Sequence, residues 1–310
     1  MLEDAPTMRD GAPLSPSAAS PALARGFGLL VVATTGLIVL GALVRAHEAG
    51  LACPDWPLCF GEVVPQFDLQ IAFEWTHRAV AGAISLAFLG LAIATLRHPV
   101  GERARPYLFA AGALLALQIL LGALTVWQLL AAWTVTSHLV VGNSFNVGLL
   151  LVALTLSGRR DAPAVTHGVR ALLALTAVLL GVQIVLGGLV SSTFAGMACP
   201  EWPTCNGGQW FPTWSGSVGL HSFHRLNGYA LWLALAAAAV ATRGIPRIRW
   251  LTGAGFLLGT LQVVVGISNV LLGIPVEVTG LHSLLAALLI LTMAATLHTA
   301  LERNPRDARV

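Results

Sequence analysis

Four of the nine histidines in this chain lie at matched places near the starts of long apolar segments. His77 and His224 stand about six residues into two segments, and His138 and His282 about five residues into two others, so all four rings lie roughly 8 to 9 Å from the helix ends. Facing helices with one inward histidine each can supply both axial nitrogens of a haem iron. Zinc or copper usually needs three or four ligands gathered more tightly. We interpret the pairs as two bis-histidine haem sites, with helix-packing hydrogen bonds as the alternative.

An arginine follows one histidine of each pair directly, Arg78 after His77 and Arg225 after His224. A guanidinium group binds carboxylates in a fixed bidentate geometry. The pattern therefore predicts that these arginines bind the propionates of the two haems. Snorkelling toward lipid headgroups is the alternative.

The only four cysteines form two C-x5-C pairs, Cys53 with Cys59 and Cys199 with Cys205. Both pairs lie in loops expected on the extracytoplasmic side, where disulfides are permitted. We predict one disulfide within each loop. It either stiffens a lid over the mouth of the bundle or is redox-active.

The composition places these residues in a membrane protein. The chain is 56% hydrophobic and only 10% charged, with a mean hydropathy of +0.79, whereas soluble domains are roughly 25% charged. Eight apolar runs of about 20 residues are each long enough to cross a bilayer. They lie near 26–45, 71–96, 107–128, 133–157, 170–191, 218–241, 250–272 and 277–299. We predict an all-α integral membrane protein with eight transmembrane helices, in which runs three and four, and seven and eight, form hairpins.

The chain also repeats itself. The segment "GALVRAHEAGLACPDWPLC" at 41–59 matches "GGLVSSTFAGMACPEWPTC" at 187–205, and the match continues through the histidines. This predicts two tandem four-helix bundles, 26–160 and 161–310, related by a pseudo-two-fold axis along the membrane normal.

Glu74 is an ionisable residue that the repeat does not keep. It lies three residues before His77, so both share one face of a helix, and the equivalent position in the second half is His221. A carboxylate beside a haem can move protons or stabilise a cationic intermediate. We therefore predict a catalytic role for Glu74, with a salt bridge to Arg78 as the alternative.

The arginines predict the orientation. All 17 basic residues are arginines, and all but Arg45, Arg78 and Arg225 flank the same side of the predicted helices. The positive-inside rule then puts both termini in the cytoplasm. Residues 1–25 are rich in Pro, Ala and Ser, and we expect a disordered cytoplasmic tail. The net charge of +3 mostly reflects these arginines and gives no indication of nucleic-acid binding.

Together, the "GLACPDWPLC" loop, the Glu-x-x-His-Arg of "EWTHR" and the repeat that carries His224, Arg225, His138 and His282 resemble the haem A synthases, in the branch with cysteine pairs. The resemblance covers the chain beyond its N-terminal tail. It implies oxidation of the C8 methyl group of haem O to the formyl group of haem A, for use by terminal oxidases. The reaction would proceed by successive hydroxylations that end in loss of water.

The resemblance also assigns the two halves. His77 and His138 would face haem O in the N-terminal half, where Glu74 acts, and His224 and His282 would ligate a permanent haem b in the C-terminal half. Haem O synthase, oxidase assembly factors and an electron donor or acceptor are the implied partners. The implied location is the bacterial plasma membrane.

Rival functions use the same residues differently. A dihaem b-type electron-transfer protein would need the histidines but not Glu74. A quinone-linked thiol oxidoreductase would explain the cysteine loops and make the histidines dispensable. A transporter fits less well, because the helices lack paired Gly/Pro breaks near the midplane.

Overall fold

The computed structural model describes residues 19–66, 68–158 and 163–301, and these residues form helices and loops without a β-strand. Eight long helices account for most of them. They are α1 (Pro21–Ala46), α2 (Leu69–Arg97), α3 (Arg105–Trp127), α4 (Ala132–Leu156), α5 (His167–Ser192), α6 (Gly216–Ala241), α7 (Pro246–Leu271) and α8 (Val276–Leu301), with short 3-10 turns η1 (Pro99–Arg103) and η2 (Ala195–Met197).

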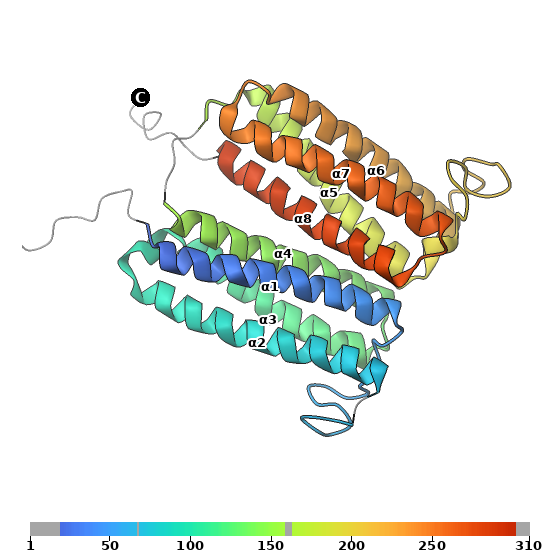
Figure 1. Cartoon of the computed structure of the whole chain (residues 1–310), viewed down its shortest axis with the longest axis horizontal. Coiled ribbons are helices and arrows are strands. Elements are labelled where there is room, and N and C mark those ends of the chain that lie inside the picture. The colour runs from blue at the N-terminus through green and yellow to red at the C-terminus, as the bar shows by residue number, and fades with distance from the viewer. Residues whose placement is uncertain (1–18, 67, 159–162, 302–310) are drawn as a thin grey trace, which may run out of the picture.

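The helices gather in two groups of four that lie side by side, α1 to α4 and α5 to α8 (Figure 1). Within the first group α1 packs against α2 and α4, and α3 packs against α4. In the second group α5, α6, α7 and α8 pack in chain order. Helices α1 and α4 contact α8, and α4 also contacts α5, which joins the groups. The pseudo-two-fold axis and the functional division of the halves stay predictions.

Seven of the described helices are long and apolar enough to cross a membrane. The exception is α6, which has the same 26 residues as α5 but carries His221, His224, Arg225 and Asn227 in its first half. These polar residues lower the mean hydropathy of α6, which explains why it is not among the helices apolar enough to cross a membrane. It nevertheless lies along α5 and α7 (Figure 1). The eighth span predicted from the sequence thus rests on this packing.

Both cysteine loops lie at one end of the molecule, and α1 begins and α8 ends at the opposite end (Figure 1). An apolar core fills the first bundle away from the loops, where the Phe88 ring meets Phe27 at 6.4 Å and Phe145 at 5.6 Å, both edge to face. Such pairs contribute about 0.5–1.5 kcal/mol each beyond their burial. The second bundle has its own core, which includes Leu173, Leu235, Ile248, Leu289 and Met293.

The boundaries confirm the predicted hairpins and correct one end. Only 128–131 separate α3 from α4, and only 272–275 separate α7 from α8. Helix α1 begins at Pro21, so 21–25 are helical and do not belong to the tail predicted for residues 1–25. Proline is favoured in a first helical turn because its missing N–H has no partner there. Residues 1–18 of that tail lie outside the described residues.

Candidate functional site

The paired histidines lie at equal depths in corresponding helices. His77 is the ninth residue of α2 and His224 the ninth of α6, while His138 and His282 are each the seventh residue of α4 and α8. The Asp68 carboxylate fixes the start of α2 by accepting a hydrogen bond from the Ile71 N–H at 2.8 Å. Each predicted pair therefore lies within one group of four helices and at matching depth, while its role as a pair of haem ligands stays a prediction.

Each of the four imidazole rings packs one edge against a glycine of the preceding helix. A Cβ atom added at that glycine would lie only 3.0 to 3.3 Å from the histidine Cε1 atom, which is tighter than ordinary contact. Any larger residue would displace the ring. The pairs are Gly41 with His77, Gly122 with His138, Gly187 with His224, and Gly266 with His282.

Amide side chains provide polar neighbours for two of these rings. Gln118 Nε2 lies 3.1 Å from His138 Nε2, and Gln183 Nε2 lies 3.2 Å from His224 Nδ1. Asn227 Nδ2 donates to Gln183 Oε1 at 2.8 Å and so orients that amide. The Nδ1 atoms of His77, His138 and His282 are buried without a hydrogen-bond partner in the described residues. Such atoms cost about 1–3 kcal/mol each when left unpaired.

Glu74 is buried on α2, with 7% of its surface exposed. Its Oε1 atom accepts a hydrogen bond from Arg78 Nε at 2.9 Å, which forms a partly buried ion pair. Oε2 makes no hydrogen bond within the described residues. The salt bridge to Arg78, the alternative given with the sequence, is therefore present and uses Oε1, while the catalytic role of Glu74 stays a prediction.

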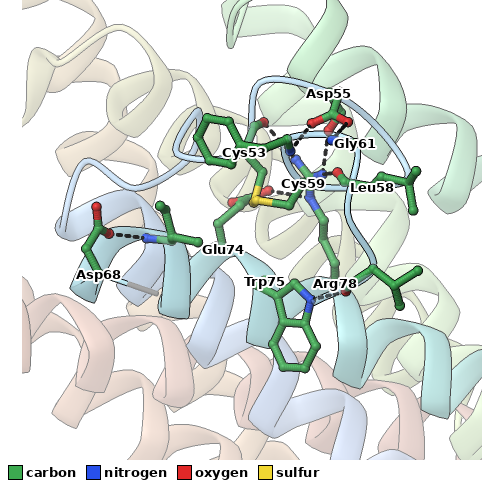
Figure 2. Close-up of a disulfide and its surroundings, with 12 residues drawn as sticks. Cys53, Asp55, Leu58, Cys59, Gly61, Asp68, Glu74, Trp75 and Arg78 are labelled. Carbon is green, nitrogen blue, oxygen red and sulfur yellow. Dashed lines mark hydrogen bonds and ion pairs between the residues drawn. A yellow bond between two sulfur atoms is a disulfide. The ribbon is translucent and has the colours of Figure 1, made fainter. Parts of the chain in front are cut away.

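Arg78 also holds the first cysteine loop onto α2 (Figure 2). Its NH1 donates to the carbonyls of Asp55 at 2.6 Å and Leu58 at 2.7 Å, and its NH2 donates to the Cys53 carbonyl at 3.1 Å. One side chain thus connects the buried Glu74 to the backbone of the loop. The position of the carboxylate and the conformation of the loop depend on each other through Arg78.

The carboxylate of Asp55 stabilises the turn that follows the Cys53–Cys59 disulfide (Figure 2). It accepts hydrogen bonds from the N–H groups of Gly61 at 2.8 Å and Phe60 at 2.7 Å. The Gly61 N–H is the main reason that the pKa of Asp55 lies below its usual value, and the Arg78 charge lowers it further. The loop is therefore built around an ionised aspartate.

The second half repeats this arrangement. Arg225 NH1 donates to the carbonyls of Glu201 and Thr204 at 3.0 Å each, and NH2 donates to the Cys199 carbonyl at 2.6 Å. The Glu201 carboxylate accepts from Gly208 and Gly207, and the Gly208 N–H chiefly lowers the pKa of Glu201. These three carbonyls belong to the residues that match the three carbonyls bound by Arg78.

The two halves differ where Glu74 stands in the first. His221 occupies that position in α6, and its Nδ1 lies 3.0 Å from the Ala195 carbonyl. Arg225 consequently has no carboxylate partner among the described residues, whereas Arg78 has Glu74. The asymmetry read from the sequence is therefore also an asymmetry of charge.

The cysteines pair within their loops, as predicted. Cys53 is bonded to Cys59 and Cys199 to Cys205, with Cα–Cα distances of 4.7 and 4.3 Å. All four residues are at most 1% exposed. Thiol–disulfide exchange requires access of an attacking thiolate to a sulfur atom. The burial therefore favours a structural role for both bonds.

Comparison with known proteins places the chain in a family. The sequence profile of the COX15-CtaA family, described as cytochrome oxidase assembly protein, matches residues 25–294. This chain belongs to that family. It is 30% identical to the "Heme A synthase" of Shewanella oneidensis, with 91% of this chain and 98% of that protein covered. It is 32% identical to the "Heme A synthase" of Halalkalibacterium halodurans (86% and 93% covered) and 32% identical to that of Alkalihalophilus pseudofirmus (84% and 92%).

The haem groups implied for this cytochrome oxidase assembly protein can be tested against its residues. Each histidine is packed on one side by a neighbouring helix yet keeps part of its surface accessible, which leaves room beside the ring. Buried Nδ1 atoms without partners fit side chains placed for a ligand. No cluster of three or more His, Cys, Asp or Glu side chains suited to a metal ion occurs in the described part of the chain. The residues fit axial ligation by two histidines in each half.

Several contacts of this family member were missed by sequence reasoning. The guanidinium groups of Arg78 and Arg225 bind loop carbonyls, so their predicted contact with propionates stays a prediction. The glycines that support the rings were not singled out, although the repeat pairs Gly41 with Gly187 and Gly122 with Gly266. Gln183 carried no such signal, because its equivalent in the first half is apolar.

Proposed function

We propose that this protein is a haem A synthase, which oxidises the C8 methyl group of haem O to the formyl group of haem A. The observation that carries the proposal is the buried Glu74 on the His77 face of α2, in a chain whose second half has His221 at the same position. The "Heme A synthase" name of relatives matched over most of the chain supports it.

The first bundle takes the substrate. His77 and His138 hold the iron of haem O from two facing helices, and Gly41 and Gly122 fix the positions of their rings. Glu74 then lies on the helix face toward the substrate. A carboxylate in a buried site interacts strongly with developing positive charge, because little water screens it.

The two oxygen atoms of the Glu74 carboxylate have different roles. Oε1 is bound to Arg78 Nε, which fixes the side chain. Oε2 would accept a proton released as the methyl group is hydroxylated and its two electrons pass to the proposed electron carrier, or would stabilise positive charge at the reacting carbon. The first loop, held by the same arginine, covers this end of the bundle and limits the entry of water.

The second bundle holds haem b, which supplies electron transfer when bound. His224 and His282 would hold its iron, Gly187 and Gly266 pack against their rings, and the Gln183 amide lies beside His224. This half has no carboxylate at the Glu74 position. It is therefore suited to hold a haem without oxidising it.

The proposal includes a topology. The arginine pattern puts both termini in the cytoplasm of a bacterial cell and both disulfide loops outside it. The arrangement of the described chain ends opposite the loops supports this topology (Figure 1). Haem O synthase, oxidase assembly factors and an electron carrier stay proposed partners.

The test is to express the chain in cells that make haem O and to extract the haems for chromatography. Haem A is expected in membranes with the full chain and absent from membranes with His138→Ala. Two equal, permanent b haems without haem A would instead indicate a dihaem electron-transfer protein. Haem A production that survives loss of all four histidines would refute both haem-based functions.

A further inference from the structure

A cavity of about 290 Å³ lies between the second cysteine loop and the first half of α6. Its walls include two exposed aromatic side chains of the loop, the Cys199–Cys205 disulfide and one face of α6. The volume approaches the lower limit of typical small-ligand sites, about 300 Å³, and is too small for a whole haem. The residues that matter here are Trp210, Phe211, Ser222, Arg225, Leu226 and Tyr229.

This cavity is separate from the proposed haem b site. Ser222, Arg225, Leu226 and Tyr229 follow the i, i+3, i+4, i+7 spacing of a single helix face. His224 is two residues after Ser222, which at 3.6 residues per turn is a rotation of about 200° around the helix axis, so His224 lies on nearly the opposite side of α6. His224 contacts α5 on that other side, through Gly187 and Gln183. A ligand in the cavity would not displace a haem between α6 and α8.

The sequence difference between the halves explains why there is space. In the first half the residue three positions before the loop-binding arginine is Trp75, whose indole N–H donates to the Val63 carbonyl at 2.7 Å and closes the loop onto α2. In the second half that residue is Ser222. Ser222 is 2% exposed, and its hydroxyl has only a weak contact with Cys199 Sγ at 3.9 Å.

The polar groups of the cavity suit a ligand with a carbonyl oxygen. Arg225 donates hydrogen bonds from NH1 and NH2 to three loop carbonyls. Its Nε makes no hydrogen bond within the described residues. The Tyr229 hydroxyl accepts from the Trp202 indole at 3.0 Å and keeps its own proton to donate. Ser222 adds one more hydroxyl. A phosphate would need several free cationic donors. A single neutral acceptor needs only the Arg225 Nε–H and the two hydroxyl groups.

We propose that this cavity binds the headgroup of a membrane quinone. The flat ring would lie beside Trp210 and Phe211, which are 58% and 42% exposed, and one face of the Phe211 ring is itself stacked on Trp214 at 5.0 Å. A ring carbonyl would accept hydrogen bonds from Arg225 Nε and the hydroxyl groups. The apolar tail would leave past Leu226 into the bilayer. The proposal concerns binding alone and does not depend on the proposed haem chemistry.

The test uses the full-length protein in detergent, an azido-substituted quinone as a photoreactive probe, and decylubiquinone as its competitor. Labelling is expected on peptides that contain Trp210 or Tyr229 and should fall when the competitor is added. Ser222→Trp, which introduces the residue of the first half, should reduce the labelling at least tenfold. Leu233→Ala is the matched control, because Leu233 is lipid-exposed on the same face but deeper in α6.

A second variant guards against a folding defect. If Ser222→Trp fails to elute as a single species, Phe211→Ala removes one wall of the cavity without changing α6 and should also reduce labelling. Labelling that is unchanged in both variants, or that lies mainly on other peptides, would overturn the proposal. Competition by phosphatidylglycerol vesicles and not by decylubiquinone would overturn it as well, and would identify a lipid-headgroup site.

Discussion

Replacing Glu74 by Gln should separate the reaction from the architecture. Glutamine keeps the size of the side chain and an oxygen that can accept the Arg78 Nε–H, so only the charge is lost. Breaking a buried ion pair costs about 3–5 kcal/mol when a charge is left without compensation. We expect the lower end, because Arg78 keeps its bonds to three carbonyls and Arg225 holds the equivalent loop without any carboxylate.

The activity should fall much more than the protein content. Removing one electrostatic stabiliser from a buried site typically costs about 10² to 10³ in rate, or about 2.7–4 kcal/mol. Partly oxidised haem with a hydroxymethyl group is expected to accumulate. The assay is chromatography of extracted haems, normalised to haem b. Glu277→Gln makes the same chemical change at an exposed position at the start of α8 and should retain parental turnover.

The reasoning is refuted if Glu74→Gln produces haem A at the parental rate with a normal haem b content. Glu74 would then be only the ion-pair partner of Arg78. A Glu74→Asp variant adds a second discrimination, because it keeps the charge but shortens the reach. If charge is what matters, Glu74→Asp should be more active than Glu74→Gln.

Three further outcomes are expected. His282→Ala should remove the haem b absorbance of the purified protein, while His138→Ala should keep it and stop haem A formation; equal spectra would contradict the assignment of the halves. Gly266→Val should weaken haem b retention roughly ten- to hundredfold, from about 1–3 kcal/mol of strain at His282, whereas Gly253→Val, which has open space around it, should not. Loop N–H groups lower the pKa of Asp55 in the folded state, so its stabilisation of the loop is present above about pH 4 and lost as the pH falls through that lowered pKa. Hydrogen exchange of the loop, corrected for intrinsic rates, should show this acid opening in the parent and not in Asp55→Asn.

The helices and the histidine depths were predictable because they depend on short-range patterns. Apolar runs of membrane length mark the helices, and a residue's distance from a helix start sets its depth. His77 and His224 therefore come out level without knowledge of the packing. The cysteine pairing was equally local, since each partner lies six residues away.

The contacts of the arginines were not predictable in the same way. Arg78 reaches carbonyls 20 to 25 residues earlier in the chain, and its partners depend on how the loop folds back over α2. Sequence alone indicates a cation that needs oxygen acceptors, and both propionates and backbone carbonyls satisfy that need. The glycines beside the histidines are a different case. Comparing the two repeats position by position, with attention to residues smaller than their surroundings, would have found them.

Two consecutive positions of the repeat account for the main chemical difference between the halves. In α2 they are Glu74 and Trp75, and in α6 they are His221 and Ser222. In the first pair, Glu74 forms an ion pair with the loop-binding Arg78, and the Trp75 indole donates a hydrogen bond to the loop at Val63. The second pair leaves Arg225 without a carboxylate and leaves a cavity beside it. A scaffold that binds its loop in the same way twice can thus place an acid toward a substrate in one half and, in the other, a donor toward a ligand from the membrane.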